Sequence, residues 1–188
     1  MGHSREHKAQ SRARILELAA GRIRQEGLGV SIAELMQAAG LTHGGFYKHF
    51  DARDELVVEA LRRAVAHNAA TYAEHGGESL GLAGYLRGYI SRTHRDGTGE
   101  GCALAALAAE VARADEPTRS VFTQGVRAAL SRVRAMLGRS DDRAEMRAML
   151  IVSAAVGAVT LARAVNDAAL SDALVSGVRR ALLALETE

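Results

Sequence analysis

The sequence predicts an all-α protein, in which a small N-terminal helix-turn-helix module is followed by a larger helical region. Apolar residues recur every three or four positions along most of the chain, which is the spacing of amphipathic helices. No segment shows the alternating pattern of a strand, and the 188 residues include one proline. Apolar residues make up 48% and charged residues 24%, a balance that favours a folded, soluble protein over a disordered one.

The first two helices are predicted from periodicity and from their ends. Residues 8–26 repeat apolar side chains every four positions, and Gly27 ends this first helix. Ser31 can then act as the N-cap of a short second helix, and Glu34 would complete a capping box in which each residue bonds the other's backbone. That helix must end by Gly40, which can adopt the left-handed conformation at a helix C-terminus.

A third helix is predicted from Thr42, its N-cap, through HGGFYKHF to Phe50, a segment that holds three of the chain's seven aromatic residues. Phe46 and Phe50 lie on one helical face, where they can fill the core of the three helices. Tyr47 follows Phe46 directly and should therefore point away from that core. A short helix, a glycine turn and a second helix with exposed glycine, histidine and lysine are typical of a DNA-reading helix-turn-helix.

The rest of the chain predicts six more helices and one flexible loop. A long helix follows Asp51 and reaches about Glu74, and five more are expected at about 80–94, 103–113, 117–137, 142–166 and 171–185. Pro117 supports a helix start, where its missing N–H is not needed. Residues 95–101 (RDGTGEG) are the clearest candidate for a flexible loop. We expect a helix-turn-helix domain at residues 1–53 and a helical domain at 54–188.

Positive charge is concentrated at the N-terminus. The net charge of the chain is +2, but residues 1–50 carry seven basic and four acidic side chains, whereas residues 51–188 carry seventeen and eighteen. The excess therefore lies where a nucleic-acid contact would need it.

Several other classes of protein find little support. One cysteine, Cys102, excludes an intramolecular disulfide and a cysteine-rich metal centre, and indicates a reducing, cytoplasmic environment. The polar, basic residues 1–14 do not resemble a secretory signal, and the longest uncharged stretch, residues 148–162, is shorter than a membrane span requires. Residues 97–101 (GTGEG) lack the preceding strand and following Lys-Ser or Lys-Thr of a phosphate loop. We expect no catalytic residue, metal site or cofactor, and no membrane.

Residues 31–50, SIAELMQAAGLTHGGFYKHF, closely resemble the signature of the TetR/AcrR family of bacterial transcription regulators, and residues 51–56 resemble the segment that follows it. The resemblance covers about the first 60 residues strongly and residues 101–110 and 161–165 more loosely. Arg53 replaces the lysine usual in the family but keeps its charge, so we expect a phosphate-side role to persist. The resemblance implies a ligand-responsive regulator, most often a repressor, that binds a palindromic operator as a homodimer and is released by a small molecule.

The resemblance also implies which residues contact double-stranded DNA. Phosphate contacts are expected from Ser31, Thr42, Tyr47 and His49, and base-edge contacts from His43, Gly44, Gly45 and Lys48. Hydroxyl groups suit phosphate oxygens, glycine lets a backbone approach the groove, and lysine can donate to guanine. The alternative, a three-helix packing module without a DNA role, explains Phe46 and Phe50 but gives no reason for an exposed Tyr47.

The C-terminal helices predict two further features. The helices at about 142–166 and 171–185 carry more apolar surface than one chain can cover, and the resemblance implies that they form a four-helix dimer interface; a monomer with a well-filled core is the alternative. The resemblance implies an effector cavity between the middle helices, for which the candidate lining residues are His67, Tyr85, Tyr89, His94, Cys102 and Phe122. Each of these is also explained by packing or surface position.

Cys102 is expected at a helix start, where the helix dipole can favour a reactive thiolate. Redox or electrophile sensing and simple packing both fit this position. The sequence identifies neither the effector nor the operator, and it does not separate a repressor from an activator. A DNA-architectural protein without ligand control is a further alternative, which a ligand screen by thermal shift would test.

Overall fold

The computed structural model describes residues 2–74, 81–138 and 141–185, and within these ranges every regular element is a helix. In chain order they are α1 (Gly2–Glu26), α2 (Ile32–Ala38), the 3₁₀ helix η1 (His43–Lys48), α3 (Arg53–Glu74), α4 (Gly81–Tyr89), α5 (Arg92–Asp96), α6 (Ala103–Val111), α7 (Glu116–Met136), α8 (Asp142–Ala164) and α9 (Ala168–Ala184). The predicted all-α fold is therefore confirmed.

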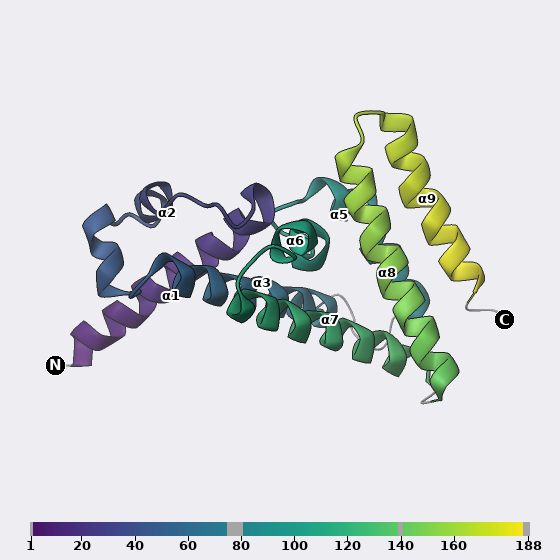
Figure 1. The fold of residues 1–188 in the computed structure, drawn as a ribbon, viewed down its shortest axis with the longest axis horizontal. Coiled ribbons are helices and arrows are strands. Elements are labelled where there is room, and N and C mark those ends of the chain that lie inside the picture. The colour runs from purple at the N-terminus through teal and green to yellow at the C-terminus, as the bar shows by residue number, and fades with distance from the viewer. Residues whose placement is uncertain (1, 75–80, 139–140, 186–188) are drawn as a thin grey trace.

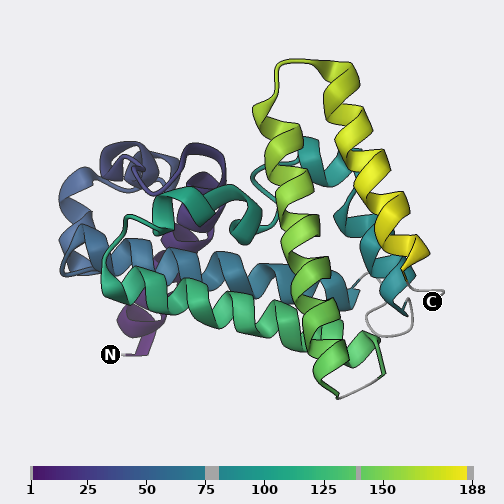
Figure 2. The ribbon, with the colours of Figure 1, turned by 45° about the vertical axis from the view of Figure 1, so that its right-hand side comes forward.

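The helices are arranged around the long helix α3. At one end of the molecule α1, α2 and η1 gather against the start of α3, while α7 runs beside α3 toward the other end (Figure 1). Helices α8 and α9 pack together at that far end, and α8 crosses α7 steeply (Figure 2). Helix α6 lies between the two ends and contacts α1, α3, α7 and α8.

Two clusters of buried apolar side chains hold these parts together. The N-terminal cluster is built around Phe46 and Phe50, and it is completed by Leu107 of α6. The second cluster lies between α4, α6, α7, α8 and α9 and includes Leu104 of α6. Phe122 of α7 contacts both clusters. Because α6 contributes to both, the N-terminal module packs directly on the helical region.

The start and end of α2 follow the sequence prediction, with one change. The Ser31 hydroxyl accepts a hydrogen bond from the Glu34 N–H at 3.4 Å, and Gly40 adopts a left-handed φ of +74°. The Glu34 carboxylate does not complete the capping box, because it accepts instead from Arg22 at 2.9 Å. Ser31 therefore caps α2 without the reciprocal bond from Glu34, and the Glu34 carboxylate instead links α2 to α1.

Several elements differ from the prediction in helix type or in their bounds. The segment after Thr42 forms a 3₁₀ helix rather than an α-helix, and the Thr42 side chain makes no capping hydrogen bond. Two adjacent glycines in so short a segment disfavour the α-helix, whereas 3₁₀ geometry is common in short pieces. The helix expected at 80–94 is broken at Ser91, which is extended (φ −133°, ψ 159°) and caps α5. Helix α9 begins at Ala168 because Asp167 caps it, while the Ser171 hydroxyl donates to the Ala162 carbonyl.

Candidate nucleic-acid interface and effector cavity

The eight residues predicted to contact DNA lie on or beside η1 and at the start of α2. Six of them are exposed: Ser31, Thr42, His43, Gly44, Tyr47 and Lys48; Gly45 and His49 are half-buried. The Tyr47 side chain is 67% exposed, although its ring packs edge-on against Phe46 at 5.2 Å between centroids. The structure therefore presents an aromatic hydroxyl and a lysine side by side at the surface.

The glycines of η1 are not required by the fold. Neither Gly44 nor Gly45 has a positive φ. A Cβ added at Gly44 would meet no atom within 4 Å, and one at Gly45 would make ordinary contacts with Thr42 Oγ1 at 3.5 Å and Met36 Cε at 3.6 Å. Since the chain itself would accept side chains here, the absence of side chains leaves room for an external molecule to approach the backbone.

His49 is placed less favourably for a phosphate contact than the prediction assumed. Its Nδ1 is buried and has no hydrogen-bond partner among the described residues. Burial, and then the positive charges of Lys8, Arg12 and Lys48, lower the pKa of His49, so the ring is neutral near pH 7. Any phosphate contact by His49 would therefore depend on a neutral N–H.

Arg12 supports the η1 surface through contacts with other residues of the same chain. Its guanidinium donates to both carboxylate oxygens of Glu59 at 2.6 Å and to Glu55 at 3.1 Å, and it lies 4.7 Å from the centre of the Phe50 ring. Its Nε also donates to the His49 carbonyl at 3.2 Å. These bonds tie α1 and α3 to the end of η1, and the hydrogen bond from Arg12 lowers the pKa of Glu59.

Arg53, for which we expected a phosphate-side role, forms a hydrogen bond within the protein. Its Nη2 donates to the Leu28 carbonyl at 2.5 Å, which joins the start of α3 to the loop after α1. The sequence could not show this contact, because Leu28 is 25 positions away.

The segment expected to be a flexible loop, residues 95–101, is held by two arginines, of which Arg24 is buried and Arg163 is half-buried. Arg24 of α1 is 5% exposed and donates through Nε to the Gly99 carbonyl at 2.5 Å. Arg163 of α8 donates to the His94 carbonyl at 2.6 Å and to the Arg95 carbonyl at 2.9 Å. Burial lowers the pKa of both arginines. The loop thus joins α1 to α8.

The glycines of this loop serve close packing rather than mobility. Gly99 and Gly101 are buried. A Cβ at Gly101 would lie 2.5 Å from Arg163 Nη2 and 3.0 Å from the Gly97 carbonyl oxygen. Glycine composition predicted the loop at residues 97–101, but residues 95 and 96 end helix α5. The packing of the loop was not predicted, since the arginines that approach it come from distant parts of the chain.

Helix α6 is also bonded directly to the loop that follows α1. The Glu110 carboxylate of α6 accepts a hydrogen bond from the Leu28 N–H at 2.7 Å. Gly27 has a φ of +89°, and a Cβ there would lie 2.6 Å from Glu110 Oε2 and 2.8 Å from Glu110 Cδ. Both the backbone conformation and the close carboxylate require glycine at this position.

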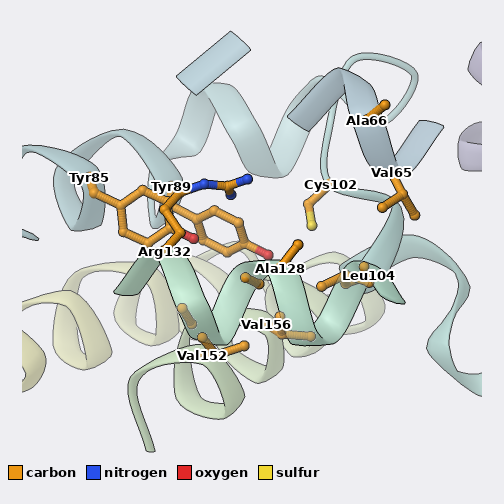
Figure 3. A pocket seen from close by; sticks show the side chains of 13 residues that line it. Val65, Ala66, Tyr85, Tyr89, Cys102, Leu104, Ala128, Arg132, Val152 and Val156 are labelled. Atoms are coloured by element: carbon orange, nitrogen blue, oxygen red, sulfur yellow. The ribbon is translucent and has the colours of Figure 1, made fainter. Parts of the chain in front are cut away.

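A cavity of about 150 Å³ lies among α3, α4, α6, α7 and α8 (Figure 3). Its walls are apolar, with Val65, Leu104, Val152 and Val156 among several smaller residues. The polar groups that line it belong to Tyr85, Tyr89, Cys102 and Arg132. The middle helices therefore enclose a mostly apolar space with a polar side.

Three of the six predicted cavity residues line this space, namely Tyr85, Tyr89 and Cys102. The other three do not line it. His67 Nε2 lies 3.5 Å from Glu100 Oε2, and Phe122 packs between the two apolar clusters. His94 contacts the lining residues Tyr89 and Cys102 but is not itself part of the lining. Arg132 also lines the cavity but was not among the predicted residues. Its spacing of three, four and seven residues from Ala129, Ala128 and Gly125 places it on their face of α7, a signal that could have identified it.

His94 positions the residues that line the cavity. Its ring lies edge-on to that of Tyr89 at 4.6 Å between centroids. Nδ1 lies 2.6 Å from the Tyr89 carbonyl oxygen, and Nε2 accepts from the Cys102 N–H at 2.8 Å. This arrangement requires a neutral imidazole with its proton on Nδ1. Burial lowers the pKa of His94, which favours the same neutral form.

Cys102 occupies the expected position at the start of α6, where it is the N-cap residue. Its side chain makes no capping hydrogen bond, is 5% exposed, and reaches the cavity wall near Tyr89 (Figure 3). The structure therefore agrees with the packing interpretation of Cys102, and it does not test sensing.

The outer face of α8 and the start of α9 expose large apolar side chains. Met146, Met149, Leu150, Leu161 and Leu170 are between 47% and 63% exposed. By length and composition alone α8 could cross a membrane, and 33% of its most apolar window is buried within the chain. Much of the apolar surface of α8 thus has no cover in a single subunit.

Two family descriptions match most of the chain. Residues 15–60 match bacterial regulatory proteins of the tetR family, and residues 81–174 match the C-terminal domain of LmrA/YxaF-like transcriptional regulators. The repressor NemR of Escherichia coli is 28% identical over 108 residues, which cover 55% of this chain and 54% of NemR. The chain thus spans about half the length of the curated relatives it matches.

Solved structures of the same fold cover nearly all of the chain. The reduced form of E. coli NemR has a TM-score of 0.72 at 21% identity and covers 91% of this chain and 96% of its own. A TetR regulator from Chloroflexus aurantiacus has a TM-score of 0.77 at 21% identity, covering 93% and 95%. One from Agrobacterium tumefaciens has a TM-score of 0.76 at 24% identity, covering 94% and 97%. The predicted combination of an N-terminal helix-turn-helix and a C-terminal helical domain is confirmed.

Proposed function

The chain belongs to the TetR family, a family of bacterial transcription regulators rather than enzymes, and we propose that it is a cytoplasmic repressor that a small molecule releases from operator DNA. The observation that carries this proposal is the exposed surface of η1. There Tyr47 and Lys48 are exposed beside two glycines that the fold does not require. A surface with a free hydroxyl, a positive charge and an accessible backbone suits the edge of a DNA groove.

The charges of the N-terminal region support the same proposal. Residues 1–50 carry seven basic and four acidic side chains, while the rest of the chain carries a slight excess of acidic ones. We propose that Ser31, Thr42, Tyr47 and His49 contact phosphates and that His43, Gly44, Gly45 and Lys48 face the bases.

The exposed face of α8 and α9 supports a homodimer. In a two-fold dimer the same apolar face occurs on both subunits, so the exposed side chains of one chain cover those of the other. Such a dimer would present two copies of η1 to major-groove segments about 34 to 36 Å apart, and the operator would be an inverted repeat.

Helix α6 provides a connection by which a ligand in the cavity could affect DNA binding. Its first turn contributes Cys102 and Leu104 to the cavity, and its last turn contributes Glu110 to the end of α1. A ligand that prefers one position of α6 would favour one placement of the DNA-binding end. Release from DNA requires only that this placement be the one unsuited to the operator.

Selection of operator sequences from a random duplex pool, followed by fluorescence anisotropy, tests DNA recognition. The selected sequences should form an inverted repeat, and affinity should fall steeply with salt as phosphate contacts displace counterions. Tyr47→Phe should weaken binding to all sequences by a similar factor. Lys48→Ala should cost about 1 to 3 kcal/mol and relax the preference at one position of each half-site.

Arg127→Ala is the matched control, because it removes an exposed positive charge from α7, away from η1. It should leave the selected sequence and the affinity nearly unchanged. If a folded Tyr47→Phe, Lys48→Ala double variant still bound the selected operator with wild-type affinity and specificity, the η1 surface would not be the DNA contact.

A further inference from the structure

The cavity contains a hydrogen-bond donor for which the described residues provide no oxygen or nitrogen partner. The Tyr89 hydroxyl is buried, and no described oxygen or nitrogen lies within hydrogen-bonding distance. Its polar neighbour is the Cys102 thiol, which is only a weak acceptor. Burial, followed by the effects of Cys102 and Tyr85, raises the pKa of Tyr89 well above its ordinary value, so the hydroxyl keeps its proton.

The charge of the cavity favours an anion. Arg132 of α7 lines the cavity, and its guanidinium lies on the same side as the two tyrosine rings (Figure 3). No aspartate or glutamate is among the described residues of the lining. A negative group on the tyrosine side would therefore meet a donor and a positive charge, and no described residue of the lining would oppose it with a like charge.

The size and the walls of the cavity favour a single ring. Its volume is about 150 Å³, and Val65, Leu104, Val152 and Val156 supply apolar surface around it. An apolar cavity of about 150 Å³ can hold one benzene molecule. A long chain or a fused ring system would need the helices to move apart.

We infer that the cavity binds a single-ring aromatic carboxylate, whose ring packs against the valine and leucine walls and whose carboxylate accepts from the Tyr89 hydroxyl and the Arg132 guanidinium. Hydrogen bonds to a charged group inside a protein are stronger than neutral ones, which makes the carboxylate a better partner than a neutral oxygen. The chemistry of the ligand rests on the cavity alone. Its effect on the operator rests on the proposed function.

Calorimetry with benzoate, toluene and benzylamine tests this inference, because the three share one ring and differ in charge. Benzoate should bind most tightly and benzylamine least. Tyr89→Phe should weaken the binding of benzoate at least about tenfold, which is the usual effect of losing a hydrogen bond to a charged group. The same substitution should change the affinity for toluene by no more than about twofold. Arg132→Met, which keeps most of the apolar stem, should bring the benzoate affinity close to that of toluene.

Tyr85→Phe is the matched control, since it removes the hydroxyl of the neighbouring ring, which is not among the buried unpaired atoms. It should weaken benzoate less than Tyr89→Phe does. The assignment of Tyr89 would be overturned if Tyr85→Phe lowered the affinity for benzoate as much as Tyr89→Phe or more. It would also be overturned if Tyr89→Phe lowered the affinities for benzoate and toluene equally. Failure of benzoate to bind at millimolar concentration would overturn the inference as a whole.

Anisotropy on the selected operator separates this inference from the proposed function. Tyr89-dependent benzoate binding that left operator affinity unchanged would support the cavity chemistry and count against ligand release. Release of the operator by a neutral compound, with no binding of benzoate, would overturn the carboxylate inference and leave the proposed repressor function intact.

Discussion

Among the large apolar side chains of α1, α2 and η1, Tyr47 is the one that is mostly exposed, whereas α8 and α9 leave Met146, Met149, Leu150, Leu161 and Leu170 about half exposed or more. The N-terminal surface instead presents hydroxyl, imidazole, lysine and bare backbone groups. DNA interfaces are polar, positively charged and wet, while permanent subunit interfaces are more apolar. The two ends of the molecule are therefore suited to partners of different chemistry.

The junction between these two ends is made by polar groups rather than by apolar packing alone. Arg24 bonds the Gly99 carbonyl, Glu110 bonds the Leu28 N–H, and both bonds join α1 to residues near α6. Directional bonds of this kind transmit a change in position, because they are lost when the groups move by about an ångström. The η1 surface and the exposed face of α8 and α9 therefore differ in chemistry, but hydrogen bonds connect the two ends of the molecule that carry them.

The largest expected effect comes from a charge on the apolar face of α8. Leu150 is 52% exposed in the single chain, so Leu150→Glu should leave the subunit folded. In a two-fold dimer the substitution would place two unpaired carboxylates in the interface, each costing about 3 to 5 kcal/mol. The dimer dissociation constant should rise at least about 100-fold, and sedimentation should change from about twice the 19.9 kDa chain mass to the chain mass.

Thr123→Glu is the control for this experiment, because it adds the same charge at an exposed position of α7 rather than on α8 or α9. It should remain dimeric. A wild-type chain that sediments as a monomer at low micromolar concentration would contradict the assignment of this face to a subunit interface, since the exposed apolar side chains would then need another partner.

An intermediate effect is expected at the junction. Gly27→Ala forces an alanine into a φ of +89° and against the Glu110 carboxylate, so it should lower the free energy of unfolding by about 2 to 3 kcal/mol. Gly21→Ala lies inside α1 with no atom within 4 Å of the new Cβ, and it should instead stabilise the protein by about 0.5 to 1 kcal/mol. Urea titration measures both, and equal effects of the two substitutions would show that Gly27 is not constrained as described.

The smallest expected effect is a pH dependence of the free energy of unfolding that arises from His94. Because burial lowers the pKa of His94 in the folded protein, the unfolded chain binds more protons below its ordinary pKa of about 6.5. The stability contributed by neutral His94 is therefore complete above about pH 6.5 and is lost as the pH falls toward the folded pKa. His49 acts in the same direction, because its pKa is lowered too.

Urea titrations between pH 7.5 and 5.5 measure this dependence. His94→Asn should be less stable at pH 7.5, because it loses the acceptor for the Cys102 N–H. It should also lose less stability than the wild type on going to pH 5.5. An identical slope in the two proteins would show that His94 does not titrate differently in the folded and unfolded states.

Much of the N-terminal module could be predicted from the sequence because its signals are local. The Ser31 cap, the left-handed Gly40 and the opposite placement of Phe46 and Tyr47 each depend on residues within a few positions of one another. The TetR-like signature supplied the function for the same reason, since it is one continuous segment. The 3₁₀ form of η1 was missed because helix type in six residues depends on small differences in energy.

The tertiary structure decided what depends on residues far apart in the chain. The cavity is formed by five helices, and Arg132, Val65 and Val156 become its lining only when those helices are packed. Residues 95–101 are composed like a flexible loop, yet they are fixed by Arg24 and Arg163, which lie about 70 positions away on either side. Periodicity and capping are set by neighbouring residues and can be seen in the sequence. Cavities, buried arginines and exposed faces depend on which distant helices pack together, which only the folded chain determines.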